Sequence, residues 1–279
     1  MILLQFDEKY LEFGKIATKT ASKNLPSHKL FLATVNLNDE NIKQLKGLHH
    51  DVIIVNEIID EKNLPRVKTR RRWGGAIGNH MREFLSCRIT KIFKFVFENF
   101  PNEKTFIITG ADTFINKGFS LETEMPDYEN YDAFFLVGKD PQPGVVGEGA
   151  HNKYRSGVVI LKNNLACKAF VNAWDNCQNL HKEIHGKKQW HWFWDQVTLR
   201  LTLEEMISRK LIKIKGLPHE KFINGSFDKN AYFWSAHFGG ERGKQNALET
   251  WKKKLEFDEA RSSNLTINTT NLNVVAPLE

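Results

Sequence analysis

Two short segments of this chain combine residue types that bind metal ions and phosphates. Residues 105–115 form an apolar run, Thr-Phe-Ile-Ile-Thr-Gly-Ala-Asp-Thr-Phe-Ile, which one carboxylate, Asp112, interrupts. Residues 237–244 supply an imidazole, three glycines and two cations within eight positions. In open α/β sheets, ligands bind at the carboxyl ends of strands, where side chains converge. The two segments together predict a metal-bridged phosphate site, whereas a solvated turn is the alternative for Asp112 alone.

The composition is that of a globular protein. The 279 residues are 41% hydrophobic and 26% charged, which allows a sizeable core and excludes a disordered chain. The sequence has no apolar run of 18 residues and no signal peptide pattern, so we expect no transmembrane segment and a location in the cytoplasm or at a membrane surface. Cys87, Cys167 and Cys177 are an odd number without metal-binding spacing, which favours a reducing compartment. The net charge of +7 favours anionic partners.

Apolar periodicity predicts strands that alternate with helices. The predicted strands are residues 29–35, 51–55, 132–137, 157–161 and 211–214 and one that begins at residue 105, and the predicted helices are residues 38–48, 79–100, 164–180 and 195–209. Such alternation implies an α/β protein with a mixed, mainly parallel sheet flanked by helices. We expect a single domain over residues 1–257. Residues 258–279 are rich in Ser, Asn and Thr, and we expect them to form a polar, mobile tail.

The order of these elements resembles that of the GT-A glycosyltransferases, in particular the nucleotide-diphospho-sugar transferases of glycosyltransferase family 8. The resemblance covers residues 29–251 and implies a Rossmann-type GT-A fold. These enzymes carry an Asp-x-Asp motif at a strand end, and Gly110-Ala111-Asp112 resembles that motif with a glycine in place of the first carboxylate. The resemblance gives Asp112 the second, metal-binding position.

The segment that begins at His237 strengthens the resemblance. Family 8 enzymes carry a late His-x-x-Gly-x-x-Lys segment, and His237, Gly240 and Lys244 are similar to it, with the lysine one residue further on. The resemblance implies that Asp112 and His237 bind the metal ion, and that Asp112, Gly240 and Lys244 contact the donor diphosphate.

These residue types suit a reaction in which a nucleoside diphosphate leaves. A divalent cation and a lysine stabilise the negative charge on the leaving group without proton transfer. Oxygen ligands suit Mg²⁺ or Mn²⁺, and an imidazole favours Mn²⁺. Because the first carboxylate of the motif is missing, we expect the ion to bind together with the donor.

Two further segments match the family's order. Ser156 and Gly157 resemble its Asn-Ser-Gly-Val strand, where small residues let the backbone lie beside the donor sugar; a tight turn into a core strand is the alternative. Asp195 and Gln196 follow a run of aromatic residues and resemble the segment that faces sugar and acceptor. The resemblance implies a catalytic role for Asp195 and a donor contact for Gln196. Asp is also a good helix N-cap, and both roles can hold together.

Lys91 is the last residue that the resemblance identifies. It lies on the predicted helix before the Asp112 strand, where these families place an Arg or Lys that touches the donor. An ordinary solvated lysine is the alternative for this position.

The sequence therefore predicts a metal-assisted glycosyltransferase. It would move a hexose or pentose from a nucleotide-diphosphate donor, a UDP-sugar, to a hydroxyl of a glycan, glycoprotein or glycolipid. A catalytically silent nucleotide- or nucleic-acid-binding protein is one alternative, suggested by Gly110 and the basic residues 66–73. No nucleic-acid-binding pattern surrounds that cluster, so we expect no nucleic-acid partner. A nucleotidyltransferase of similar fold is disfavoured because no Gly-rich phosphate loop follows the first predicted strand.

Overall fold

The structure is a computed structural model of the chain. It describes residues 1–60, 62, 64, 80–138, 153–185, 194–223, 228–236 and 240–270. The chain divides into two compact units, Met1–Ser235 and Ala236–Glu279. All described strands belong to the N-terminal unit, so this unit also contains the edge of the sheet where the strands' carboxyl ends lie.

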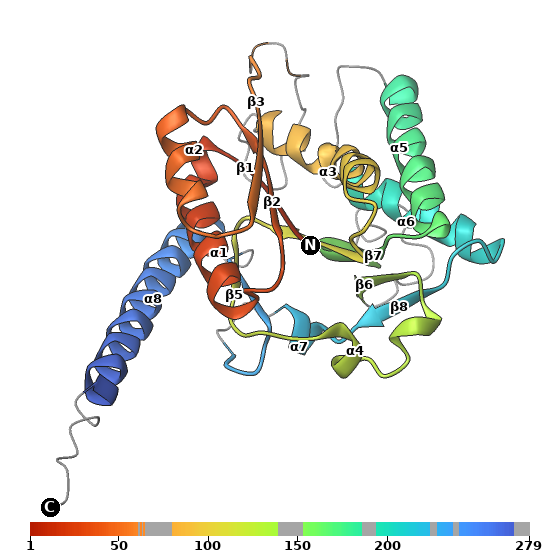
Figure 1. Cartoon of the computed structure of the whole chain (residues 1–279). Coiled ribbons are helices and arrows are strands. Elements are labelled where there is room, and N and C mark those ends of the chain that lie inside the picture. Colours follow the sequence, from red (N-terminus) through yellow and green to blue (C-terminus); the bar gives the residue numbers. More distant parts are fainter. Residues whose placement is uncertain are drawn as a thin grey trace, which may run out of the picture. The chain divides into compact units, whose positions relative to one another are not determined.

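A seven-stranded sheet forms the centre of the N-terminal unit (Figure 1). Its order is β3 (Val52–Glu57), β2 (Leu30–Val35), β1 (Ile2–Asp7), β4 (Thr105–Gly110), β7 (Tyr154–Lys162), β6 (Ala133–Val137) and β8 (Ile214–Leu217). Strands β1 to β4 pair in parallel, β7 is antiparallel to both β4 and β6, and β8 is parallel to β6. The predicted mixed, mainly parallel α/β sheet is confirmed.

Helices cover both faces of the sheet because side chains alternate along its strands. Leu4 and Phe6 of β1 belong to a core shared with α1 (Leu11–Asn24) and α2 (Asp39–Lys46). Leu3 belongs to the opposite core, which contains residues of α3 (His80–Asn99), α5 (Leu165–His185) and α6 (Trp194–Ser208). The remaining described elements are short: η1 (Glu8–Tyr10), α4 (Leu121–Glu124), η4 (Tyr128–Asn130), α7 (His219–Phe222), and the antiparallel pair β5 (Thr113–Ile115) and β9 (Phe233–Ser235).

The first helix packs unusually closely on the central strand. Gly14 of α1 faces Phe6 of β1, and a Cβ atom at Gly14 would lie 2.5 Å from the Cζ atom of that ring. Both residues are buried. Only a glycine permits this approach without displacement of the ring, since real Cβ contacts are longer.

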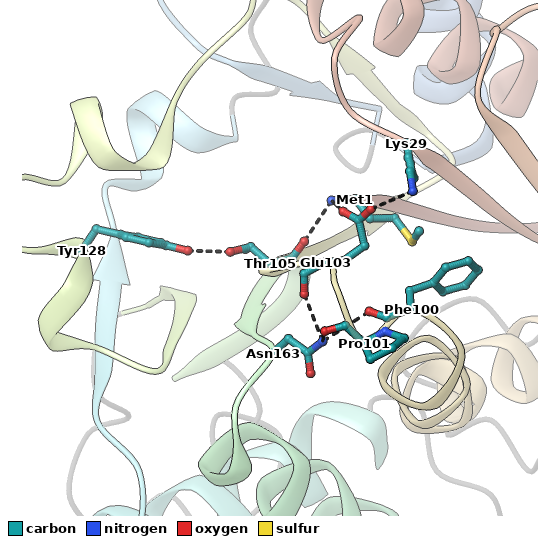
Figure 2. Close-up of polar contacts among 8 residues, drawn as sticks. All are labelled: Met1, Lys29, Phe100, Pro101, Glu103, Thr105, Tyr128 and Asn163. Atoms are coloured by element: carbon teal, nitrogen blue, oxygen red, sulfur yellow. Dashed lines mark hydrogen bonds and ion pairs between the residues drawn. The ribbon is translucent and has the colours of Figure 1, made fainter.

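Polar contacts tie the amino edge of the sheet together (Figure 2). The Met1 amine donates to the Thr105 carbonyl at 2.9 Å and forms an ion pair with Glu103 at 3.6 Å, and its burial lowers its pKa. The Thr105 hydroxyl lies 2.5 Å from the Tyr128 hydroxyl. The Asn163 amide donates to the carbonyl of Glu103 at 3.0 Å. These contacts join β1, β4 and the turn after β7 at the edge opposite to the strands' carboxyl ends.

The C-terminal unit contains one long helix, α8 (Gly240–Thr270). Its buried side chains, Ala247, Leu248, Trp251 and Leu255, recur at helical spacing. Residues 258–270, within the segment for which the sequence predicts a polar tail, are helical. Lys254 and Asp258 are paired at 3.8 Å across one turn, a spacing that supports helix continuation.

Within the described residues, no helix is both long and apolar enough to cross a membrane.

Candidate active site

Asp112 lies at the carboxyl edge of the sheet, directly after β4. Strand β4 ends at Gly110, which pairs with Gln5 of β1. A Cβ atom at Gly110 would lie 2.7 Å from the Asp112 Oδ1 atom. The Asp112 carboxylate therefore lies where a side chain at position 110 would begin, and a residue other than glycine there would require a shift of this carboxylate.

The predicted metal ligands are described only in part. No group of three His, Cys, Asp or Glu side chains that could hold a metal ion occurs in the part of the chain that the structure describes. His237 lies outside the described residues, and Gly240 and Lys244 belong to the first two turns of α8 in the C-terminal unit. Carboxylate oxygen atoms such as those of Asp112 suit Mg²⁺ or Mn²⁺. The predicted site of Asp112 and His237 remains a prediction.

Asp195 and Ser156, which the sequence identifies in separate segments, are in direct contact. The Ser156 hydroxyl donates to the Asp195 Oδ2 atom at 2.9 Å. The Asp195 side chain is buried, with 6% of the residue exposed. Helix α6 begins at Trp194, so Asp195 lies within its first turn and is not its N-cap residue. The positive end of the helix dipole favours a carboxylate at this position.

Strand β7 brings this pair to the end of β4. Because β7 is antiparallel to β4, its first residues lie beside the last residues of β4, and Thr109 pairs with Val158. The Thr109 hydroxyl donates to the Gly157 carbonyl at 3.2 Å. A side chain at Gly157 would contact the Ile223 Cδ1 atom at 3.5 Å, so this glycine faces the apolar core. That arrangement agrees with the alternative of a core strand, and a backbone contact with the donor remains a prediction.

A buried network holds the backbone of Asp195. The Trp174 indole N–H of α5 donates to the Asp195 carbonyl at 3.2 Å and to the Thr198 hydroxyl oxygen at 3.1 Å. The Thr198 hydroxyl also donates to the Asp195 carbonyl at 3.2 Å. Gln196, the predicted donor contact, is half-buried beside this network. The sequence shows Trp174 only as a member of an apolar helix face, and its partner becomes apparent only in the fold.

Lys91 lies in the middle of α3 and is exposed. The pKa of the Asp175 carboxyl on α5 is lowered: burial opposes this shift, the hydrogen bonds from Lys94 and Thr90 lower the pKa most, and the charge of Lys91 adds a smaller effect. The Asp175 carboxylate also binds the Lys94 amine at 2.6 Å and the Thr90 hydroxyl at 2.8 Å. Lys91 thus lies near an ion pair between α3 and α5, and its contact with the donor remains a prediction.

Arg88, three residues earlier on α3, is a buried cation that the sequence analysis did not identify. It is 5% exposed, forms an ion pair with Glu57 at the end of β3, and lies 5.4 Å from the centre of the Phe84 ring. Its Nη1 atom has no hydrogen-bond partner among the described residues. A cation in a helix with many apolar residues was the available signal, but the ion pair with β3 depends on the tertiary structure.

Gln5, which contacts the same helix as Arg88, has a second side-chain atom without a partner among the described residues. Its amide nitrogen donates to the Leu85 carbonyl of α3 at 2.7 Å, while its Oε1 atom is buried and, in the described part of the chain, unpartnered. Gln5 lies near the carboxyl end of β1, and Glu57, the partner of Arg88, ends β3. Buried polar groups usually have hydrogen-bond partners, so the Arg88 Nη1 donor and the Gln5 Oε1 acceptor, which have none within the described part of the chain, require an explanation.

Comparisons with known proteins support the fold that the resemblance implies. No protein-family model and no curated protein matches the sequence significantly. The structure is similar to that of an active-site mutant of LgtC, with a TM-score of 0.52 and 11% identity over 89% of this chain and 94% of that one. It is also similar to the galactosyltransferase LgtC in complex with donor and acceptor sugar analogues, with a TM-score of 0.50 and 12% identity over 88% of this chain and 94% of that one. The chain therefore has an LgtC-like GT-A fold, as its sequence predicts.

Proposed function

We propose that this protein is a glycosyltransferase that transfers a sugar from a nucleotide-diphosphate donor, a UDP-sugar, to a hydroxyl of a glycan, glycoprotein or glycolipid. One observation carries the proposal: the buried Asp195 carboxylate is held by Ser156 beside the end of β4, the strand that Asp112 follows. In α/β sheets of this kind, ligands bind at this edge. The likeness of the fold to that of a galactosyltransferase supports the same reaction class.

Asp195 would face the transferred sugar. As the diphosphate leaves, positive charge develops on the sugar ring, and a fixed carboxylate stabilises it. Ser156 holds the carboxylate by a hydrogen bond, so little reorganisation is needed during the reaction. Gln196 would contact the donor from the same turn of α6, and the Gly157 backbone would lie beside the sugar.

The phosphate end of the donor would lie near Asp112. Asp112 and His237 would hold Mn²⁺ or Mg²⁺, and the ion, when bound with the donor, would neutralise charge on the diphosphate. Gly240 would let the backbone approach the phosphates, and Lys244 would contact them directly. With one carboxylate rather than two, the chain alone should bind the ion weakly.

Arg88 and Gln5 would contact a hydroxyl group of the donor. A hydroxyl can accept a hydrogen bond from the unpaired Nη1 atom and donate one to the unpaired Oε1 atom. Arg88 thereby supplies a cation on α3 in addition to Lys91, and it does so from a buried position next to β1 and β3.

A thermal-shift panel of UDP-, GDP- and TDP-sugars with and without Mn²⁺, followed by measurement of nucleoside diphosphate release, tests this function. A ligand that binds only the folded state must raise the unfolding temperature. Asp195→Asn should keep the donor-induced stabilisation and lose turnover by about a hundredfold or more. Glu129→Gln, an exposed change at the amino edge, serves as control. Absence of both stabilisation and turnover with every nucleotide-sugar would refute the proposal.

A further inference from the structure

The first turn of α6 is fixed by side chains from two other elements. Ser156 of β7 binds the Asp195 carboxylate, and Trp174 of α5 binds the Asp195 carbonyl. We propose that Trp174 and Thr198 are positioning residues, which act on sugar transfer through Asp195. This inference rests on the proposed function, because it assigns them a role only if Asp195 takes part in the reaction.

The hydrogen bonds that Trp174 makes to α6 are additional to the backbone hydrogen bonds that form this helix. Inside an α-helix, a carbonyl accepts the N–H of the residue four positions later, which for Asp195 is Leu199. The Asp195 carbonyl accepts two additional donors, the Trp174 indole at 3.2 Å and the Thr198 hydroxyl at 3.2 Å. The indole and the hydroxyl are themselves joined at 3.1 Å, so the three groups form a closed triangle.

Burial makes this triangle rigid. Trp174 and Thr198 are fully buried and Asp195 nearly so, which keeps water from replacing any of the three contacts. A buried indole N–H needs some acceptor, and a core role alone would be satisfied by any carbonyl nearby. Here the acceptor is the backbone of the residue whose carboxylate Ser156 holds.

Attachment at two points determines the orientation of the Asp195 side chain. Trp174 holds the backbone carbonyl of Asp195, and Ser156 holds its carboxylate. The first turn of a helix has few internal hydrogen bonds and moves easily without such support. A displacement of about 1 Å between reacting groups can reduce the rate by about a hundredfold.

The test compares variants that each change one buried hydrogen-bonding side chain. Thr198→Val keeps the shape of the side chain and removes its hydroxyl, Thr198→Ser keeps the hydroxyl, and Trp174→Phe removes the indole N–H. Tyr128→Phe is the matched control: it also removes a buried hydroxyl, at 2.5 Å from Thr105, but at the opposite edge of the sheet (Figure 2).

The readouts are the unfolding temperature and the kcat and KM for the UDP-sugar that the parent protein turns over fastest. We expect Thr198→Val and Trp174→Phe to lower kcat at least about tenfold with nearly unchanged KM, because contacts that act in the transition state change kcat. Thr198→Ser should recover turnover relative to Thr198→Val. Tyr128→Phe should lower the unfolding temperature and leave kcat unchanged.

The outcomes separate the two proposals. If Thr198→Val and Trp174→Phe kept the kcat of Tyr128→Phe while Asp195→Asn lost turnover, the positioning role would be wrong and the proposed function would stand. If the parent turned over no UDP-sugar, the proposed function would be wrong, and the positioning role with it.

Discussion

The ion pair between Arg88 and Glu57 leads to a prediction in which removal of either partner has a different effect on stability. Arg88 is 5% exposed, whereas the Glu57 side chain is 50% exposed. Glu57→Gln removes the counter-charge and leaves a charged guanidinium in a buried position. Arg88→Met removes the buried charge together with the unpaired Nη1 atom and retains a long apolar side chain. We therefore expect Glu57→Gln to destabilise the protein and Arg88→Met to leave its stability nearly unchanged.

The magnitude follows from the burial of the two partners. Removal of one partner from a fully buried pair costs about 3–5 kcal/mol, and exposed pairs contribute about 0–1 kcal/mol. Since only the arginine is buried here, we expect Glu57→Gln to cost about 2 kcal/mol. In a unit of this size, each kcal/mol lowers the unfolding temperature by about 2–4 °C, so the loss should be about 4–8 °C. Arg88→Met should remain within about 1 kcal/mol of the parent.

Thermal and urea unfolding of the parent, both single variants and the double variant, followed by circular dichroism, measure these differences. The double variant should be more stable than Glu57→Gln, because it no longer contains a buried, unpaired charge. Arg88→Met should also lose the stabilisation that a UDP-sugar gives to the parent. If Arg88→Met were destabilised as strongly as Glu57→Gln, Arg88 would be a structural residue, and the argument that its free nitrogen serves a ligand would be refuted.

Three further predictions concern other parts of the chain. Burial lowers the pKa of His28 below 6.5, so the unfolded chain binds a proton more readily than the folded protein, and stability is lost as pH falls through that value. His28→Gln should reduce this loss of stability, measured by urea unfolding at several pH values. The same pH dependence in the parent and the variant would contradict the prediction. Gly14→Ala should destabilise by about 1–3 kcal/mol in the same assay, because its Cβ atom would meet Phe6 at 2.5 Å, and an unchanged midpoint would contradict the packing argument. Asp112→Asn should reduce turnover by about a hundredfold and abolish Mn²⁺-dependent stabilisation by the donor, whereas full activity of the parent in excess EDTA would rule out the metal site.

The sequence predicts those elements whose hydrophobic pattern is local. Strands β2, β3, β4 and β6 and helices α2, α3, α5 and α6 lie where apolar periodicity predicts them, within a few residues. Strand β1 and helix α1 were not predicted. Five of the six residues of β1 are buried, so the strand lacks polar-apolar alternation, and α1 buries mainly small and polar residues such as Gly14, Ala17 and Thr18. The three-residue strands β5 and β9 are too short to give a pattern.

The sequence likewise identifies some residues of the candidate site and not others. Asp112, Ser156 and Asp195 were identifiable because each lies at a recognisable strand end, strand start or helix start. Arg88, Gln5 and Trp174 were not, because their significance depends on partners 21 or more residues away in the sequence, such as Glu57, Leu85 and Asp195. The types and spacing of residues along the chain do not show which distant residues pair. The resemblance shows such pairings only for residues that match a family motif.

The position of β1 in the sheet has a consequence for synthesis of the protein on the ribosome. Its Ile2 pairs on one side with Leu30 and on the other with Ile107, about a hundred residues later. At typical translation rates of about 5–20 residues per second, one edge of the nascent strand stays open for roughly 5–20 s. Until β4 is synthesised, the edge of β1 that β4 covers in the finished sheet lacks that partner, and five of the six residues of β1 are of the kind that the fold buries. The strand at the centre of the finished sheet is therefore an edge strand open to association with other chains until β4 emerges.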